Sequence, residues 1–250
     1  MLTLMPSNAT DVCAQLICSY SMSYVAVVER FVSRHFPRAG VAVLAGSTAR
    51  GPRTSTSDID LLLLGDEIFV DDRTSMAATY RFEGEIFEVF AYTDEGFEVW
   101  ATRGFEQYRP VIVQMLIDGI AVRGAIEHEK YKQKWSLQYE AGPTIEATEA
   151  TFRRYVITDL LDDYRDATAP AERHVLAALL YERTAELILL SNSRWIGAGK
   201  YLPRRLAEFD QDRAAALVTP LVEGRHDQFA NRIAIELDRA GGRVQEGFRR

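Results

Sequence analysis

LAGSTARGPRTSTSDIDLLLL, the stretch at residues 44–64, decides the fold. The apolar run Val41–Ala45 leads into a Gly-Ser turn and predicts a short buried strand. A polar loop follows, and the segment Asp58–Leu64 predicts a second strand, whose four consecutive leucines indicate burial on both faces of a sheet. The stretch therefore predicts two strands, joined by a turn and a polar loop, with two acidic residues at the start of the second strand.

The two acidic residues suggest the chemistry of this stretch. Residues two apart on a strand point to the same side, so Asp58 and Asp60 project together, with Ile59 on the opposite face. Two carboxylates this close repel each other unless a cation lies between them, and oxygen ligands favour Mg²⁺ bound together with substrate phosphates. The Gly46-Ser47 turn adds a close backbone approach and a hydroxyl donor. Each part alone has a simpler interpretation, a solvated strand end or an ordinary turn, but their order predicts metal-assisted phosphoryl or nucleotidyl transfer.

In this order, the stretch resembles the nucleotidyltransferase superfamily related to DNA polymerase beta, whose signature is a Gly-Ser motif followed by two alternating acids on a strand. The resemblance implies that Ser47 and the backbone around Gly46 bind the β and γ phosphates of a nucleoside triphosphate. It also implies that Asp58 and Asp60 ligate Mg²⁺. Arg50, in the connecting loop, is a candidate phosphate ligand, and the alternative for it is a solvated loop arginine.

The resemblance further implies a third carboxylate on a neighbouring antiparallel strand. Two strand-like segments joined at Glu83-Gly84 predict a hairpin, and its second strand offers Glu85 and Glu88. Glu85 adjoins the turn, where water can solvate it, whereas Glu88 lies mid-strand between apolar residues, where an unpaired charge is costly. We therefore select Glu88 as the third carboxylate, either a metal ligand or the general base. The alternative is that Glu88 is simply an exposed residue of a half-open sheet.

The chain changes character near residue 142. Strands and helices alternate before it, which predicts an α/β (α+β) domain over residues 1–142. The resemblance implies that this is a nucleotidyltransferase domain with a small mixed sheet. Helical periodicity dominates after it, which predicts an all-α helical bundle over residues 143–250, and Ala141-Gly142-Pro143 is the expected hinge. Helical periods begin near residue 126, with a predicted helix over residues 127–139 before the hinge, and the helices predicted after the hinge span residues 144–166, 171–191, 204–218 and 223–240.

A helical half after such a domain resembles the antibiotic-modifying branch of the superfamily, the aminoglycoside adenylyltransferases. The segment Trp195–Leu206 is similar to a Gly-Lys loop in the streptomycin/spectinomycin adenylyltransferase group. That similarity implies that Lys200 is a phosphate ligand and that Tyr201 lies near the nucleotide. The alternative is a helix–helix connection with a solvated lysine.

Acidic residues of the helical half suggest an acceptor site for a polycation, or simply a solvated face of the bundle. Four of them fall on one face of the helix predicted over residues 144–166: Asp159, Asp162, Asp163 and Asp166. On the next predicted helix, Glu182 and Glu186 lie one turn apart, and either could orient an acceptor hydroxyl.

Composition limits the other possibilities. The 250 residues are 47% apolar and carry a net charge of −7. The apolar content indicates a globular protein, and the negative charge argues against a general nucleic-acid partner, since phosphate binding leaves a basic footprint. Cys13 and Cys18 make no disulfide framework and no metal spacing, and we expect them buried on a helix. No signal peptide and no membrane span are expected, so the predicted setting is cytoplasmic.

These patterns together predict a Mg²⁺-dependent nucleotidyltransferase that moves a nucleoside monophosphate onto a hydroxyl of a small molecule. AMP from ATP is the expected donor group, and an aminoglycoside-type antibiotic is the acceptor that the resemblance implies. Two alternatives stay open: a regulatory or antitoxin-like protein that keeps this fold, and an enzyme that nucleotidylates a protein. The sequence allows either a monomer or a homodimer.

Overall fold

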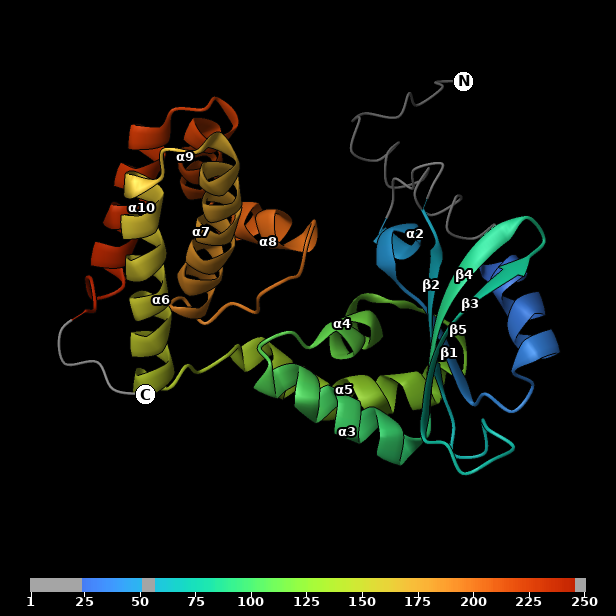
Figure 1. The fold of residues 1–250 in the computed structure, drawn as a ribbon. Coiled ribbons are helices and arrows are strands. Elements are labelled where there is room, and N and C mark those ends of the chain that lie inside the picture. Colours follow the sequence, from blue (N-terminus) through green and yellow to red (C-terminus); the bar gives the residue numbers. More distant parts are fainter. Residues whose placement is uncertain (1–23, 51–56, 246–250) are drawn as a thin grey trace, which may run out of the picture. The chain divides into compact units, whose positions relative to one another are not determined.

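The chain forms two compact units, Met1–Glu140 and Ala141–Arg250, in a computed structural model that describes residues 24–50 and 57–245 (Figure 1). The sequence placed the boundary at residue 142. Cys13 and Cys18, which were expected to be buried on a helix, lie outside the described residues, as does the centre of the polar loop. The described part of the chain contains no helix long and apolar enough to cross a membrane.

The first unit is built on a mixed sheet with the strand order β3-β4-β2-β1-β5. Its described strands are β1 (Val41–Leu44), β2 (Ile59–Leu64), β3 (Ser75–Phe82), β4 (Glu85–Tyr92) and β5 (Ile120–Arg123). β2 pairs with β1 antiparallel and with β4 parallel, while β3 pairs antiparallel with β4 at the sheet edge. The small mixed sheet that the sequence predicted is therefore confirmed.

The direction of β4 corrects one expectation. The strand that carries Glu88 was expected to run antiparallel to the strand of the two aspartates, but β4 is parallel to β2. After β2 the chain crosses to the sheet edge, forms β3 there, and returns through the hairpin at Glu83 and Gly84, both at positive φ. This return inserts β4 between β3 and β2, which makes β4 parallel to β2.

One face of the sheet is covered by a helix described over residues 24–35. Phe31 of this helix is 0% exposed, and its ring stacks on Phe87 of β4 with the ring centroids 4.1 Å apart. Alternate residues of β2, Ile59, Leu61 and Leu63, belong to the same buried cluster. Since side chains alternate along a strand, burial of this set directs the intervening residues, the second aspartate among them, to the opposite face.

Helices cover part of that opposite face. They are α2 (Gly46–Arg50), α3 (Asp94–Glu106), α4 (Val111–Asp118) and α5 (Ala125–Ala141). α4 packs on β1 and β2, and α2 packs on β2. Trp135 of α5 packs its ring against Phe97 and Phe105 of α3, with each pair of ring centroids 5.9 Å apart. The exposed residues along β3 show that this edge of the face stays open in the described structure.

The second unit is helical, as the sequence predicted. Its described helices are α6 (Ala147–Asp166), α7 (Pro170–Leu190), α8 (Tyr201–Phe209), α9 (Gln211–Val222) and α10 (His226–Arg239). The single helix predicted over residues 204–218 is wrong, because α8 and α9 divide at Asp210. The Asp210 carboxylate accepts a hydrogen bond from the backbone N–H of Arg213 at 2.8 Å and so caps α9.

Two buried acids hold this unit together through arginines. Glu236 of α10 is 1% exposed and forms ion pairs with Arg213, Arg232 and Arg239. Glu186 of α7 is equally buried and pairs with Arg153 of α6. A buried carboxylate without such partners is strongly destabilising. The pair of Glu236 with Arg213 joins α10 to α9, and the pair of Glu186 with Arg153 joins α7 to α6.

Replacing Phe31 with alanine tests the packing that orients the sheet. We expect Phe31→Ala to lower the free energy of unfolding by about 3–5 kcal/mol, because the substitution removes a fully buried ring and leaves a cavity. The measurement is urea unfolding, with Val70→Ala as the control, since Val70 is 86% exposed and its truncation should cost no more than about 0.5 kcal/mol. A cost below about 1 kcal/mol for Phe31→Ala would show that the ring does not organise the core.

Candidate active site

Gly46 and Asp60 meet directly at the end of β1. Gly46 has a φ of +65°, and a Cβ added to it would lie 1.7 Å from Oδ2 of Asp60. The backbone N–H of Ala45 also donates a hydrogen bond of 2.9 Å to the carbonyl oxygen of Asp60. Only glycine accommodates both the left-handed backbone and the close carboxylate. The Gly-Ser turn is therefore held against the carboxylate of β2.

Thr48 links the same turn to the other aspartate. It is 2% exposed, and its hydroxyl donates a long hydrogen bond of 3.4 Å to the carbonyl oxygen of Asp58. The buried Thr48 of α2 therefore contacts Asp58, the residue that precedes β2. The sequence analysis did not select Thr48, because a threonine in a polar turn carries no pattern that separates a buried residue from a solvated one.

The structure brings the three selected carboxylates to one region of the sheet. Asp58 directly precedes β2, and Asp60 is the direct register partner of Glu88 on β4, so the two side chains share a face. Asp60 is half-buried, whereas Asp58 and Glu88 are exposed. Glu85 lies on the same side of β4 as the core residue Phe87, which is the opposite face. Of the two glutamates, Glu88 is therefore the one that shares a face with Asp60.

These carboxylates fit a cation that is shared with a substrate. Among residues 24–50 and 57–245, no group of three or more His, Cys, Asp or Glu side chains is placed to hold a metal ion without other ligands. Mg²⁺ does not require such a cage, since it binds through one or two carboxylates together with substrate phosphates and waters. The oxygen-only donors Asp58 and Asp60, beside a turn where a Cβ has no room, suit that kind of site.

The other selected residues lie in different places. Ser47 is half-buried in the first turn of α2, and Arg50 is the last residue of that helix. Lys200 and Tyr201 belong to the second unit, at the start of α8, and both are exposed. The ammonium group of Lys200 lies 5.4 Å from the centroid of the Tyr201 ring. Their assignment to nucleotide binding stays a prediction.

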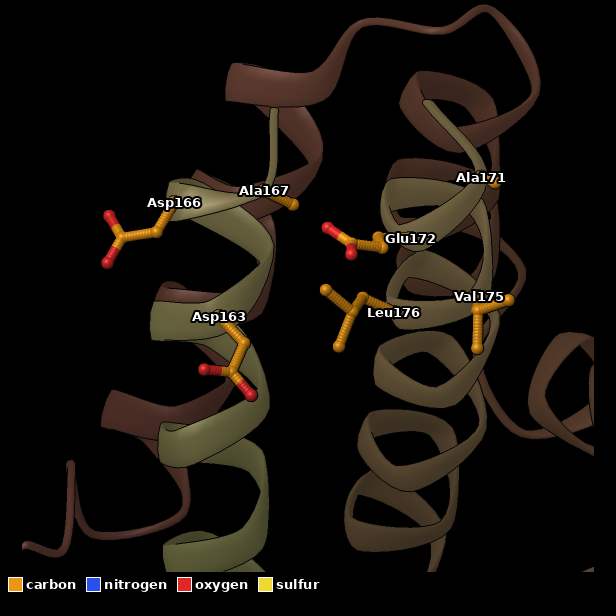
Figure 2. Close-up of a pocket in the computed structure, with 7 residues that line it drawn as sticks. All are labelled: Asp163, Asp166, Ala167, Ala171, Glu172, Val175 and Leu176. Carbon is orange, nitrogen blue, oxygen red and sulfur yellow. The ribbon is translucent and has the colours of Figure 1, made fainter. Parts of the chain in front are cut away.

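The acidic residues predicted to share one face of the second unit lie in two different environments. Asp163 and Asp166 of α6 line a pocket of about 660 Å³ together with Glu172 of α7. Figure 2 shows the Glu172 side chain directed toward α6 and that of Asp166 directed away from α7. Asp162, in contrast, accepts a hydrogen bond of 2.9 Å from Gln245 and pairs with Arg243.

Glu186 serves the packing of its own unit. Its carboxylate is 3.1 Å from the Arg153 guanidinium and 3.3 Å from that of Arg183. With a side chain that is 2% exposed, Glu186 offers an acceptor molecule no open oxygen surface. The hypothesis that Glu186 orients an acceptor hydroxyl is therefore dropped, and Glu182 is the half-buried member of that pair.

Comparison with known proteins gives one family match. Residues 25–118 match the family model described as the nucleotidyltransferase domain. The solved structure of a nucleotidyltransferase-like protein from Exiguobacterium sibiricum 255-15 is similar over 88% of this chain and 73% of that chain, with 11% sequence identity and a TM-score of 0.43. No curated protein matches the chain. The matched segment contains the Gly-Ser turn and all three selected carboxylates, and it ends at the last residue of α4.

Two glycine substitutions test the contact between the turn and the carboxylate. Gly46→Ala should displace Asp60, because the new Cβ cannot occupy the space of Oδ2, and we expect loss of more than about 90% of the nucleotide affinity. The matched control is Gly84→Ala, since Gly84 also has a positive φ, +86°, but an added Cβ there meets nothing within 4 Å.

Both variants should lose about 1–2 kcal/mol of stability from the left-handed backbone, measured by urea unfolding, but only Gly46→Ala should lose nucleotide binding. Equal affinities of Gly46→Ala and Gly84→Ala for nucleotide would contradict the assignment of this turn.

Proposed function

We propose that the protein transfers a nucleoside monophosphate from a Mg²⁺-bound nucleoside triphosphate, with ATP as the donor, to a hydroxyl group of a small molecule; the match of residues 25–118 to the nucleotidyltransferase domain supports this proposal. The observation that carries the proposal is the direct contact of Gly46 with the Asp60 carboxylate, in register with Glu88. A phosphate-binding turn, a carboxylate pair and a further carboxylate are the parts that nucleotidyl transfer requires.

The turn and the aspartates act on the donor. The Ser47 hydroxyl and the backbone at Gly46 bind the β and γ phosphates, and the absence of a Cβ at Gly46 leaves room for the Asp60 carboxylate beside them. Asp58 and Asp60 hold the metal ion. When bound, Mg²⁺ neutralises the charge of the triphosphate and makes the α-phosphorus more electrophilic.

Glu88 serves the acceptor side of the reaction. The acceptor hydroxyl oxygen forms a bond to the α-phosphorus while the bond from that phosphorus to the bridging oxygen breaks, and pyrophosphate leaves with the electron pair. The hydroxyl proton must go to a base within hydrogen-bonding reach. Glu88 is exposed and shares the face of Asp60. Its strand, β4, lies on the side of β2 away from β1, so Glu88 can accept that proton.

The acceptor class is the open part of this proposal. Aminoglycoside-type antibiotics represent the polycationic acceptors that the sequence resemblance implies, and the acidic residues of the helical unit are compatible with them. A screen of hydroxylated small molecules with Mg²⁺-ATP, read as pyrophosphate release, identifies the acceptor. Radioactive labelling of a protein in place of a small molecule would point to protein nucleotidylation.

Neutralising either aspartate tests the catalytic assignment. We expect Asp58→Asn and Asp60→Asn each to reduce pyrophosphate release at least about 10³-fold, because each removes a negative oxygen ligand of the metal. The control is Asp72→Asn, an exposed aspartate in the loop before β3, which should keep full activity. Thermal unfolding verifies that all variants fold. Full residual activity in either Asp58→Asn or Asp60→Asn refutes the assigned role.

Nucleotide binding is testable without an acceptor. A nonhydrolysable ATP analogue with Mg²⁺, at about 100 times its Kd, stabilises the protein by about 2.7 kcal/mol, which raises the melting temperature by roughly 5 °C or more. The rise should require Mg²⁺ and should vanish in Asp60→Asn. An unchanged melting temperature at saturating nucleotide counts against any donor role for this site.

A further inference from the structure

The open edge of the sheet presents one arginine beside the carboxylates. Along β3 the exposed residues Ala77, Thr79 and Arg81 alternate with half-buried ones, so they share one face. The register places Thr79 opposite Glu88, and Glu88 opposite Asp60. Arg81, two residues from Thr79, is therefore on the same face as the carboxylates.

The order of groups across this face follows the strand order. The Gly46 turn contacts Asp60 on β2, β4 contributes Glu88 next, and β3 contributes Arg81 at the edge. Neighbouring strands lie about 4.8 Å apart, so β3 is about 10 Å from β2. Arg81 pairs with Ile86, which is two residues before Glu88, and so lies diagonal to Glu88 rather than directly beside it.

In-line transfer places the two substrates at opposite ends of this series of groups, which runs from the Gly46 turn to Arg81. The attacking and leaving oxygens lie on opposite sides of the α-phosphorus. If pyrophosphate leaves toward the Gly-Ser turn, the acceptor hydroxyl must approach from the side of β4 and β3. An acceptor in that position lies over Glu88 and within reach of the long Arg81 side chain.

Arg81 differs from three other arginines near the edges of this sheet, each of which forms an ion pair. Arg30 pairs with Glu83, Arg73 with Asp71, and Arg123 with Glu29. Arg81 is exposed and makes no side-chain ion pair or hydrogen bond with another described residue, Glu88 included. A guanidinium is a rigid fork of donors that matches phosphate and carboxylate groups, so an anion of the acceptor is the partner that its chemistry fits.

We infer that Arg81 binds an anionic group of the acceptor, a phosphate ester or a carboxylate, next to the hydroxyl that Glu88 deprotonates. The acceptor is then an anionic hydroxylated small molecule, in contrast to the polycationic acceptor that the sequence resemblance implies. The inference rests on the proposed function, because the side from which the acceptor approaches follows from where the donor's phosphates bind.

Calorimetric titration with matched probes tests this inference. Ribose is compared with ribose 5-phosphate, and glucose with gluconate, on protein saturated with Mg²⁺ and a nonhydrolysable ATP analogue, so that the donor phosphate site is filled. At least one anionic probe should bind about tenfold or more tightly than its neutral partner, because a charged hydrogen bond contributes about 1.5–3 kcal/mol.

Arg81→Ala should reduce that preference to less than about twofold, and the preference of the wild type should weaken with added salt. The matched control is Arg34→Ala, which removes an exposed arginine from the helix on the opposite face of the sheet and should keep the preference. Equal binding of both members of each pair to the wild type overturns the inference, as does an anion preference that survives Arg81→Ala.

The same samples separate this inference from the proposed function. A Mg²⁺-dependent rise in melting temperature with the nucleotide analogue reports the donor site alone. With that rise present, absence of an Arg81-dependent anion preference overturns only the acceptor assignment. Without that rise, the donor site fails, and the acceptor assignment fails with it.

Discussion

The contact between Gly46 and the Asp60 carboxylate is the constraint on which the rest of the site depends. It requires a left-handed backbone at Gly46 and no Cβ there, since a Cβ would overlap Oδ2 of Asp60. The contact also requires β1 and β2 to pair in one register, with Leu44 opposite Leu61. That register is held by the buried leucines and by the helix over residues 24–35 on the other face. Core packing thus determines where a turn and a carboxylate meet.

The position of β4, parallel to β2 and between β2 and β3, sets the order of the groups across the site. Because β4 lies between β2 and β3, the groups follow one another from the turn to the edge: turn, aspartates, Glu88, then Thr79 and Arg81. A sheet with β3 next to β2 would separate Glu88 from Asp60 by an additional strand. On the proposed function, this strand order separates a donor side at the Gly-Ser turn from an acceptor side at the edge of the sheet. Acids that are buried elsewhere, such as Glu236, form ion pairs with arginines.

Much of this arrangement could be predicted from the sequence because it depends on local patterns. The spacing of Gly46 and the two aspartates, and the hairpin at Glu83-Gly84, are local signals. The direction of β4 could not be predicted, because it depends on where the chain between β2 and β3 crosses the sheet. The burial argument that preferred Glu88 to Glu85 is wrong in its premise, since Glu88 is exposed and Glu85 is half-buried. The register separates the two residues directly, because it places Glu88 on the face of Asp60. Residues 204–218 were predicted as one continuous helix, but Asp210 caps α9 within this segment. Tertiary packing selects one of several possible caps there.

The central claim is that Gly46 and Asp60 form one donor site rather than two independent features. A double-mutant cycle on the affinity for Mg²⁺ with a nonhydrolysable ATP analogue tests it most directly, using Gly46→Ala, Asp60→Asn and the combined variant. If the contact makes the site, Gly46→Ala already removes most of the binding free energy that Asp60→Asn can remove. The loss in the combined variant is then smaller than the sum of the two single losses by about 1 kcal/mol or more. Effects that add to within about 0.3 kcal/mol would contradict the claim, because independent sites behave in that way.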